Sequence, residues 1–137
     1  MAAFKKFEEI LAWQKARLLN QILAQHIKAG KFKNDFKLIN QMQDSCGSAM
    51  DNIAEGFERG GNKEFIQFLY VSKGSCGELR SQLYRAIDRN HITTAEFDEM
   101  YNLSKEIIVM DQALIIYLEN SPLKGVKYKN RKPPPNS

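Results

Sequence analysis

Two consecutive glycines, Gly60 and Gly61, divide the most strongly helical part of the chain into two segments. On either side, between Ser45 and Leu83, apolar residues recur three and four positions apart, as they do on one face of an α-helix. Because the connection is so short, the two helices must fold back against each other. The stretch therefore predicts a helical hairpin, with Asn62 as the N-cap of its second helix. The apolar positions are Met50, Ile53, Ala54, Phe57, Phe65, Phe68, Leu69, Leu79 and Leu83.

Folding this hairpin about its glycines places small residues opposite one another. Ala49 comes to lie near Ser72, and Gly47 near Gly74. A glycine inside a helix costs roughly 1 kcal/mol relative to alanine. Glycines at positions 47, 74 and 77 therefore predict a close approach of the two helices, at the short end of the usual ~8–10 Å between axes.

The 137 residues suffice for one domain with a real core. Four long periodic segments fill most of the chain, and we expect helices over residues 7–29, 34–59, 63–90 and 93–120. Thr93 and Glu96 form a capping box at the start of the last helix, flanked by Ile92 and Phe97 as a hydrophobic staple. Alternating β-branched runs are missing from the sequence. The predicted fold class is all-α, a four-helix bundle over residues 1–121.

The first and last helices carry more apolar surface than one bundle covers. Residues 107–118 are apolar nearly all round, and the first helix has two apolar stripes. A helix that is apolar on all sides needs a further cover, and a second copy of the chain is the economical one. We therefore predict a homo-oligomer. Trp13 is either an anchor of that interface or half covered by its own helix. The candidate interface residues are Trp13, Val109, Ala113 and Ile116.

The net charge of +4 is distributed unevenly along the chain. Residues 122–137 hold five cations and no acid, whereas the rest holds 15 basic and 16 acidic residues. Three consecutive prolines exclude a helix in this tail, which we expect to be extended or disordered. It serves either as a solubilising segment or as a basic arm that contacts phosphates. Its cations are Lys124, Lys127, Lys129, Arg131 and Lys132.

Patterns typical of catalysis, cofactor binding or metal binding are missing from the sequence. His26 and His91 have no neighbouring cysteine or serine signature, and no phosphate-binding glycine loop follows a strand. Cys46 and Cys76 are expected to be free, buried thiols rather than a disulfide. No run of about 18 apolar residues predicts a membrane span, and no apolar signal core opens the chain. We expect a cytoplasmic protein that is not an enzyme and has no cofactor.

Polar residues gather where the two hairpin helices meet their turn. Asn52, Glu55, Arg59 and Glu64 fall in this region, and Glu55 and Arg59 have the spacing of a helical ion pair. One interpretation is a hydrogen-bonded network that fixes the turn. The other is a surface for a ligand or partner that presents Arg59 and Lys63.

Three segments resemble one protein family closely. They are F-E-E-I-L-A-W-Q-K-A at residues 7–16, N-I-A-E-G-F-E-R-G-G-N-K-E-F-I-Q-F-L at residues 52–69, and G-S-C-G-E-L-R-S-Q-L at residues 74–83. The family consists of bacterial four-helix-bundle proteins first seen encoded in intervening sequences of 23S ribosomal RNA genes. Related proteins accompany the reverse transcriptase of diversity-generating retroelements. The resemblance covers residues 7–121.

This resemblance implies an antiparallel up-down bundle that forms a ring of five copies and has no enzymatic activity. In relatives, a basic ring binds nucleic acid and the polymerase. The positions that match the family pattern are Asn52, Glu55, Gly56, Arg59, Glu64, Phe65, Ser75 and Glu78.

Together these observations predict a homo-oligomeric accessory factor associated with RNA or DNA. Its candidate contacts are Arg59, Lys63 and the five tail cations. The alternative is a scaffold that recruits a partner protein, such as a reverse transcriptase, without binding nucleic acid.

Overall fold

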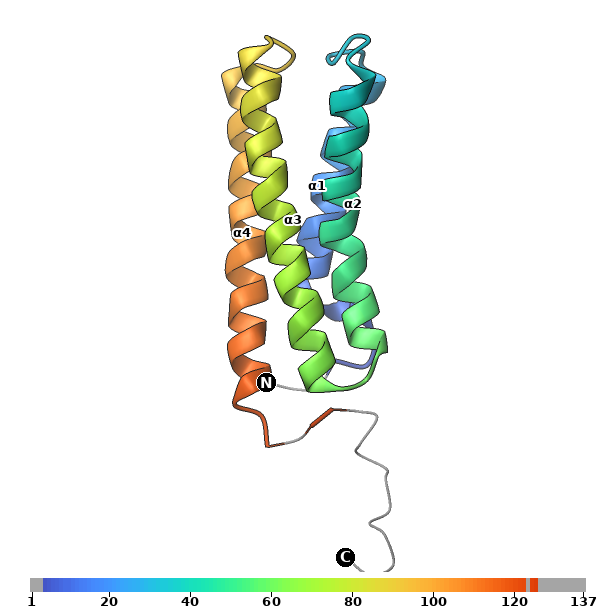
Figure 1. The fold of residues 1–137 in the computed structure, drawn as a ribbon, viewed down its shortest axis with the longest axis vertical. Helices are drawn as coiled ribbons and strands as arrows, with labels where there is room; N and C mark the ends of the chain where they lie inside the picture. Colours follow the sequence, from blue (N-terminus) through green and yellow to red (C-terminus); the bar gives the residue numbers. More distant parts are fainter. Residues whose placement is uncertain (1–3, 123, 126–137) are drawn as a thin grey trace, which may run out of the picture.

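The computed structural model describes residues 4–122 and 124–125. Over these residues the chain folds into a short 3₁₀ helix, η1 (Phe7–Glu9), and four α-helices, with no strand. The helices are α1 (Leu11–Lys28), α2 (Phe36–Glu58), α3 (Asn62–Asp88) and α4 (Thr94–Glu119). The loops α1–α2 and α3–α4 lie at one end of the molecule, and the α2–α3 turn lies at the other (Figure 1). The predicted all-α class with four helices is confirmed.

The helix ends differ from prediction at two places. The first predicted helix is interrupted at Ile10, whose backbone is extended (φ −77°, ψ 120°) and whose side chain is buried in the core. Asn62 is the first residue of α3 rather than its cap, and Gly61 occupies the cap position. The backbone N–H of Asn62 instead donates to the carbonyl of Lys124 at 2.6 Å. A carbonyl from the end of the described chain thus satisfies a donor that the helix itself leaves free.

The predicted capping box at α4 is confirmed. The backbone N–H of Glu96 donates to Oγ1 of Thr93 at 3.1 Å, and the N–H of Thr93 donates to Oε1 of Glu96 at 2.9 Å. Glu96 also forms an ion pair with Lys31 of the α1–α2 loop. The start of α4 is therefore fixed to the neighbouring loop as well as capped.

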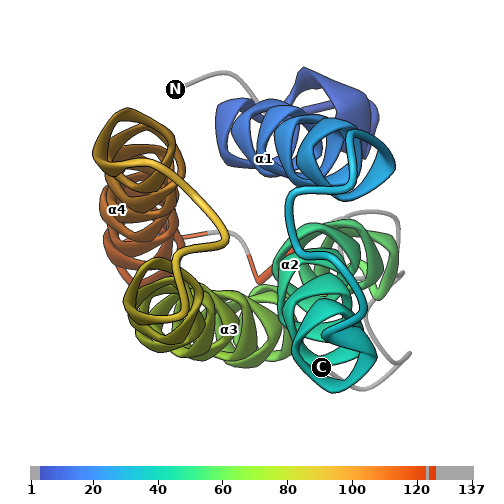
Figure 2. The ribbon, with the colours of Figure 1, turned by 90° about the horizontal axis from the view of Figure 1, so that it is seen from above.

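One hydrophobic core runs along the space between the four helices (Figure 2). Leu19, Met42, Leu79 and Ile107, one from each helix, are fully buried. Phe32, from the α1–α2 loop, closes the core near its end and is also fully buried. None of the described helices is long and apolar enough to cross a membrane.

The α2–α3 hairpin has the predicted register. Oγ of Ser72 donates to the carbonyl of Ala49 at 2.9 Å, so these two small residues meet as expected. Gly60 adopts a left-handed conformation (φ +79°) in the turn, which glycine reaches without a steric penalty.

The close packing predicted at three glycines is wrong. A β-carbon built at Gly47 or Gly74 would meet nothing within 4 Å, and one at Gly77 would meet only the tip of Arg80 at 3.9 Å. The helices are tightest at Gly56, where a β-carbon would lie 2.6 Å from that of Phe68. Gly56 faces α3 close to the turn, whereas the other three glycines do not point at a neighbour.

Candidate functional site

Two rows of polar residues face each other along the packed surfaces of α2 and α3. We call this arrangement the α2–α3 seam. It consists of Asp35, Gln41, Ser45 and Ser48 on the α2 side and Ser75, Glu78, Gln82, Arg85 and Arg89 on the α3 side.

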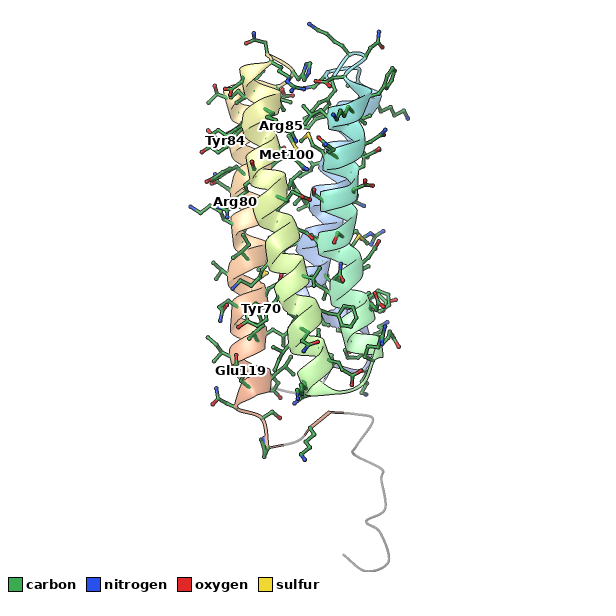
Figure 3. The ribbon with its side chains drawn as sticks, in the orientation of Figure 1. Tyr70, Arg80, Tyr84, Arg85, Met100 and Glu119 are labelled. Atoms are coloured by element: carbon green, nitrogen blue, oxygen red, sulfur yellow. The ribbon has the colours of Figure 1, made fainter. Side chains whose placement is uncertain are left out.

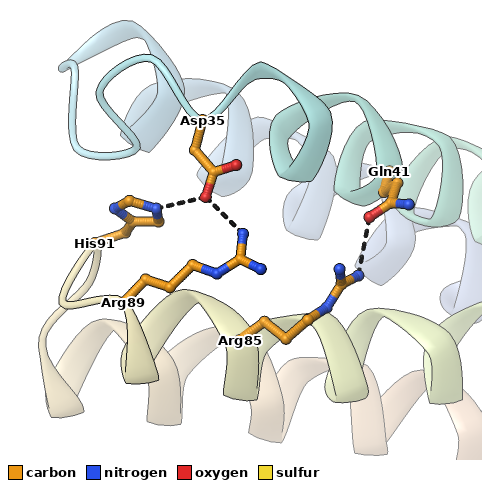
Figure 4. A network of polar contacts seen from close by, with 5 residues as sticks. All are labelled: Asp35, Gln41, Arg85, Arg89 and His91. Carbon is orange, nitrogen blue, oxygen red and sulfur yellow. Dashed lines mark hydrogen bonds and ion pairs between the residues drawn. The ribbon is translucent and has the colours of Figure 1, made fainter.

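At one end of the seam, Asp35 joins three elements of the fold (Figure 4). Its Oδ2 accepts hydrogen bonds from Nη1 of Arg89 and from Nε2 of His91, each at 2.8 Å. The bond from His91 and then that from Arg89 hold the pKa of Asp35 at about 2, below its ordinary 3.8. Asp35 precedes α2, Arg89 ends α3, and His91 leads into α4, so one carboxylate fixes the junction of three helices.

Further along the seam the contacts are side chain to side chain. Nη2 of Arg85 donates to Oε1 of Gln41 at 3.0 Å (Figure 4). Oγ of Ser45 donates to Oε1 of Glu78, and Oγ of Ser75 contacts Oγ of Ser48 at 2.8 Å. These bonds hold α2 and α3 in a single register, because a slip by one turn would break all of them together.

A groove of about 290 Å³ opens on this seam. Gln82 lies at its base, only 4% exposed, and its Oε1 has no hydrogen-bond partner within the described part of the chain. Amide and carboxylate oxygens dominate the lining, so the groove suits a group that donates hydrogen bonds. The lining residues are Gln41, Asp44, Glu78, Ser81, Gln82 and Arg85.

The polar residues predicted to cluster at the hairpin turn are only partly brought together. Nη2 of Arg59 lies 3.0 Å from Oε1 of Glu55, and the Arg59 guanidinium lies over the ring of Phe68 at 5.2 Å. Asn52 turns away and donates to Ser48, to the carbonyl at 2.8 Å and to Oγ at 2.9 Å. The Glu55–Arg59 pair is half exposed, and exposed pairs of this kind contribute at most ~1 kcal/mol.

Two of the cations predicted to contact nucleic acid lie together. Lys63 and Lys124 line one groove of about 430 Å³ at the turn end of the bundle, together with Glu64 and Glu119. The two acids balance the two lysines, so this groove has no net charge. Lys127, Lys129, Arg131 and Lys132 lie outside the described residues.

The remaining positions of the family pattern have structural places. Gly56 and Phe65 are buried and touch across the hairpin, since a β-carbon at Gly56 would lie 3.0 Å from Cδ1 of Phe65. Ser75 and Glu78 belong to the α2–α3 seam. These four residues fix how α2 packs on α3.

The candidate interface residues divide into two groups. Val109, Ala113 and Ile116 are exposed on one side of α4, and the side chains of Val109 and Ile116 are 68% and 52% accessible. Glu106 shares their side of the helix and lies 3.8 Å from Nζ of Lys15. Leu11 and Leu18, exposed on α1, flank Lys15 at helical spacing. We call Leu11, Leu18, Val109, Ala113 and Ile116 the α1–α4 apolar face.

Trp13 is not part of the α1–α4 apolar face. Its indole is partly buried and packs edge to face on Phe7 with ring centroids 5.0 Å apart. Trp13 therefore fastens η1 to α1, which agrees with the second of the two interpretations of this residue.

Both cysteines are free and buried, as predicted. Burial raises the pKa of each thiol to about 12. Thiolates do not form at neutral pH under these conditions, so neither cysteine can act as a nucleophile. No group of three or more potential metal ligands occurs within residues 4–122 and 124–125.

Asp111 is a buried acid that the sequence analysis missed. It is fully buried in α4, and neither carboxyl oxygen has a hydrogen-bond partner among the residues described. Burial raises its pKa from 3.8 to about 7. The only sequence signal is one acid inside the apolar run of α4, which also fits an exposed position.

The comparisons with known proteins agree with the resemblance seen in the sequence. A protein of unknown function from the S23 ribosomal protein family of Bacteroides thetaiotaomicron has a similar crystal structure. The TM-score is 0.70 at 21% identity, over 77% of this chain and 98% of the other, a likeness that shows the fold alone. No curated protein matches the sequence. The model of the 23S rRNA-intervening sequence protein family matches residues 8–113, and the chain belongs to that family.

Proposed function

We propose that this member of the 23S rRNA-intervening sequence protein family is a non-enzymatic accessory factor that associates with RNA or DNA. In this proposal it forms an antiparallel up-down bundle that assembles into a homo-oligomer. The resemblance to the family implies five copies. Two features of the surface support the proposal, one for assembly and one for nucleic-acid binding.

The α1–α4 apolar face supports assembly. It presents four large aliphatic side chains, Leu11, Leu18, Val109 and Ile116, on two adjacent helices. Fully burying one such side chain contributes roughly 1.5–3 kcal/mol. A second copy that covers this face would therefore gain enough to offset a substantial part of the entropy lost on association.

The position of Lys124 is the observation that carries the nucleic-acid part. Its carbonyl accepts from Asn62 at the start of α3, so the basic segment leaves the bundle at the α2–α3 turn, beside Lys63. The four further cations of residues 126–137 follow directly in the sequence. Cations concentrated at one end supply the contacts on which phosphate affinity depends. An oligomer repeats this end in every copy, which raises the avidity for a long strand.

A filter-binding titration across salt concentrations tests this function. The full chain should bind RNA at low salt, and its affinity should fall as salt rises, by about 0.7 in logarithmic slope for each phosphate contact to a single strand. A variant with Lys127, Lys129, Arg131 and Lys132 changed to glutamine should have a shallower slope. Negligible binding by the unchanged chain at low salt contradicts the proposal.

The α2–α3 groove favours the second candidate function, a scaffold that recruits a partner protein. The groove places the buried amide of Gln82 beside Glu78 and Asp44, which suits a donor side chain such as lysine or arginine. Affinity purification after nuclease treatment separates the two functions. Recovery of nucleic acid without a specific protein, in the untreated sample, counts against the scaffold.

A further inference from the structure

A row of aromatic and cationic side chains follows the outer side of the α3–α4 pair. On α3 it begins at Tyr70 and Lys73 and continues to Arg80 and Tyr84, all at helical spacing. Figure 3 shows Tyr70, Arg80 and Tyr84 at successive levels of this helix. On α4 the row contains Phe97, Tyr101, Lys105 and Gln112.

Contacts between the two helices make this row one surface. Tyr84 packs edge to face on Phe97 and Tyr101, with ring centroids 5.0 and 5.9 Å away. The Arg80 guanidinium lies 5.5 Å from the centroid of the Tyr101 ring, and Nζ of Lys105 lies 5.8 Å from it. At the lower end Nζ of Lys73 lies 5.3 Å from the Tyr70 ring and contacts Gln112 on α4.

The row has cations but no accessible acid of its own. Residues 66–84 of α3 include a single acid, Glu78, which bonds to Ser45 on α2. Residues 101–112 of α4 include two acids. Glu106 pairs with Lys15 on α1, and Asp111 is fully buried. Every acid in this span is thus directed away from Lys73, Arg80 and Lys105, although the chain without its tail is close to neutral overall.

The tyrosines of the row are available to a ligand. The side chains of Tyr70 and Tyr84 are 50% and 51% exposed. Proteins that bind single-stranded nucleic acid combine cations along the backbone with aromatic rings on which bases stack. The row also points toward the basic end, because Lys63 lies two turns before Tyr70 on the same side of α3. From Lys63 to Tyr84 the stripe spans about 30 Å.

We propose that the α3–α4 row from Tyr70 to Tyr84 is a binding surface for single-stranded nucleic acid. In it Lys73, Arg80 and Lys105 contact phosphates, and Tyr70 and Tyr84 stack on bases. This inference rests on the proposed function and assigns its site. A strand held by the basic end at Lys63 and Lys124 continues along this row.

Fluorescence anisotropy of the full chain with a labelled oligothymidylate of about 20 nucleotides tests the site. Tyr84→Leu removes the ring and keeps apolar bulk, and it should weaken binding about 5- to 100-fold without changing the salt slope. The double variant Arg80→Gln/Lys105→Gln should lower the slope by about 1.4, or 0.7 for each contact. Tyr70→Leu repeats the ring test at a half-exposed site away from the Tyr84 cluster, in case Tyr84→Leu disturbs the fold.

A matched control comes from the opposite end of the bundle. Phe36 and Lys37 present an exposed ring and an exposed cation at the start of α2, and Phe36→Leu/Lys37→Gln should leave binding unchanged. Equal losses in the control and in the row variants would overturn the site, as would unchanged binding by folded row variants. Duplex DNA that competes as well as the single strand would also overturn it. If the unchanged chain fails to bind, the proposed function fails and the site with it.

Discussion

Gly56 of α2 lies so close to Phe68 of α3 that a β-carbon at position 56 would stand 2.6 Å from the β-carbon of Phe68. Backbone and the base of a side chain meet here, and neither can move without shifting a helix. This contact sets the separation of α2 and α3 near their turn. Position 56 therefore requires glycine, although glycine is a poor helix former.

Gly56→Ala should lower the free energy of unfolding by about 1–3 kcal/mol, because overpacking forces the helices apart. Gly47→Ala and Gly74→Ala are matched controls in the same two helices, and nothing lies within 4 Å of their new β-carbons. Each control should raise stability by up to ~1 kcal/mol. Urea unfolding at one protein concentration measures all three, and a stable Gly56→Ala variant would contradict the packing described.

The glycines show what helical spacing predicts and what it does not. Spacing predicted that Ala49 meets Ser72, and a hydrogen bond joins them. It did not distinguish Gly56 from Gly47, because that distinction depends on the angle at which two helices cross. A rotation of a few tens of degrees moves a residue from the contact line to the open side, and the sequence does not encode this rotation locally.

Asp35 should make the bundle sensitive to acid. Its pKa is lowered to about 2 in the folded chain by His91 and Arg89. The stability that this provides is present above pH 3.8 and is lost as the pH falls towards 2. Asp35→Asn should lower the melting temperature at neutral pH and flatten its decline in acid. Asp51→Asn, at an exposed position of α2, is the control, and an identical acid profile in both variants would contradict this role of Asp35.

Asp111 should have the opposite dependence on pH. Its folded pKa is raised to about 7, so the unfolded chain ionises first as the pH increases. Stability should fall between pH 3.8 and 7, by up to ~1.4 kcal/mol for each pH unit. Asp111→Asn should be more stable than the parent at pH 8 and similar at pH 4. Urea unfolding across this range measures the effect, and a flat difference between the two proteins would contradict it.

The two thiols should be unreactive while the chain is folded. Cys46 and Cys76 are buried, with pKa values raised to about 12. Ellman's reagent should therefore modify neither cysteine in the native protein and both in urea. Rapid modification without denaturant would show that the core opens near these residues.

The sequence predicted much less of the α2–α3 seam than of the helices. Ser75 and Glu78 were identified only through the family pattern, and Gln41, Gln82 and Arg85 were not identified at all. Polar residues on a helix look alike in sequence whether they face water or a neighbouring helix. The seam became visible only when the structure paired Arg85 with Gln41. Asp111 was missed for the converse reason, because an acid is expected at the surface and this one is buried.

The mass of the protein in solution tests the central claim, that this chain assembles through its α1–α4 apolar face. Multi-angle light scattering at micromolar concentration should give a multiple of the 15.8 kDa chain mass. Ile116→Asp should reduce that mass, whereas Val71→Asp, at an exposed apolar position of α3, should not. A parent protein that scatters as a single 15.8 kDa chain would contradict the account.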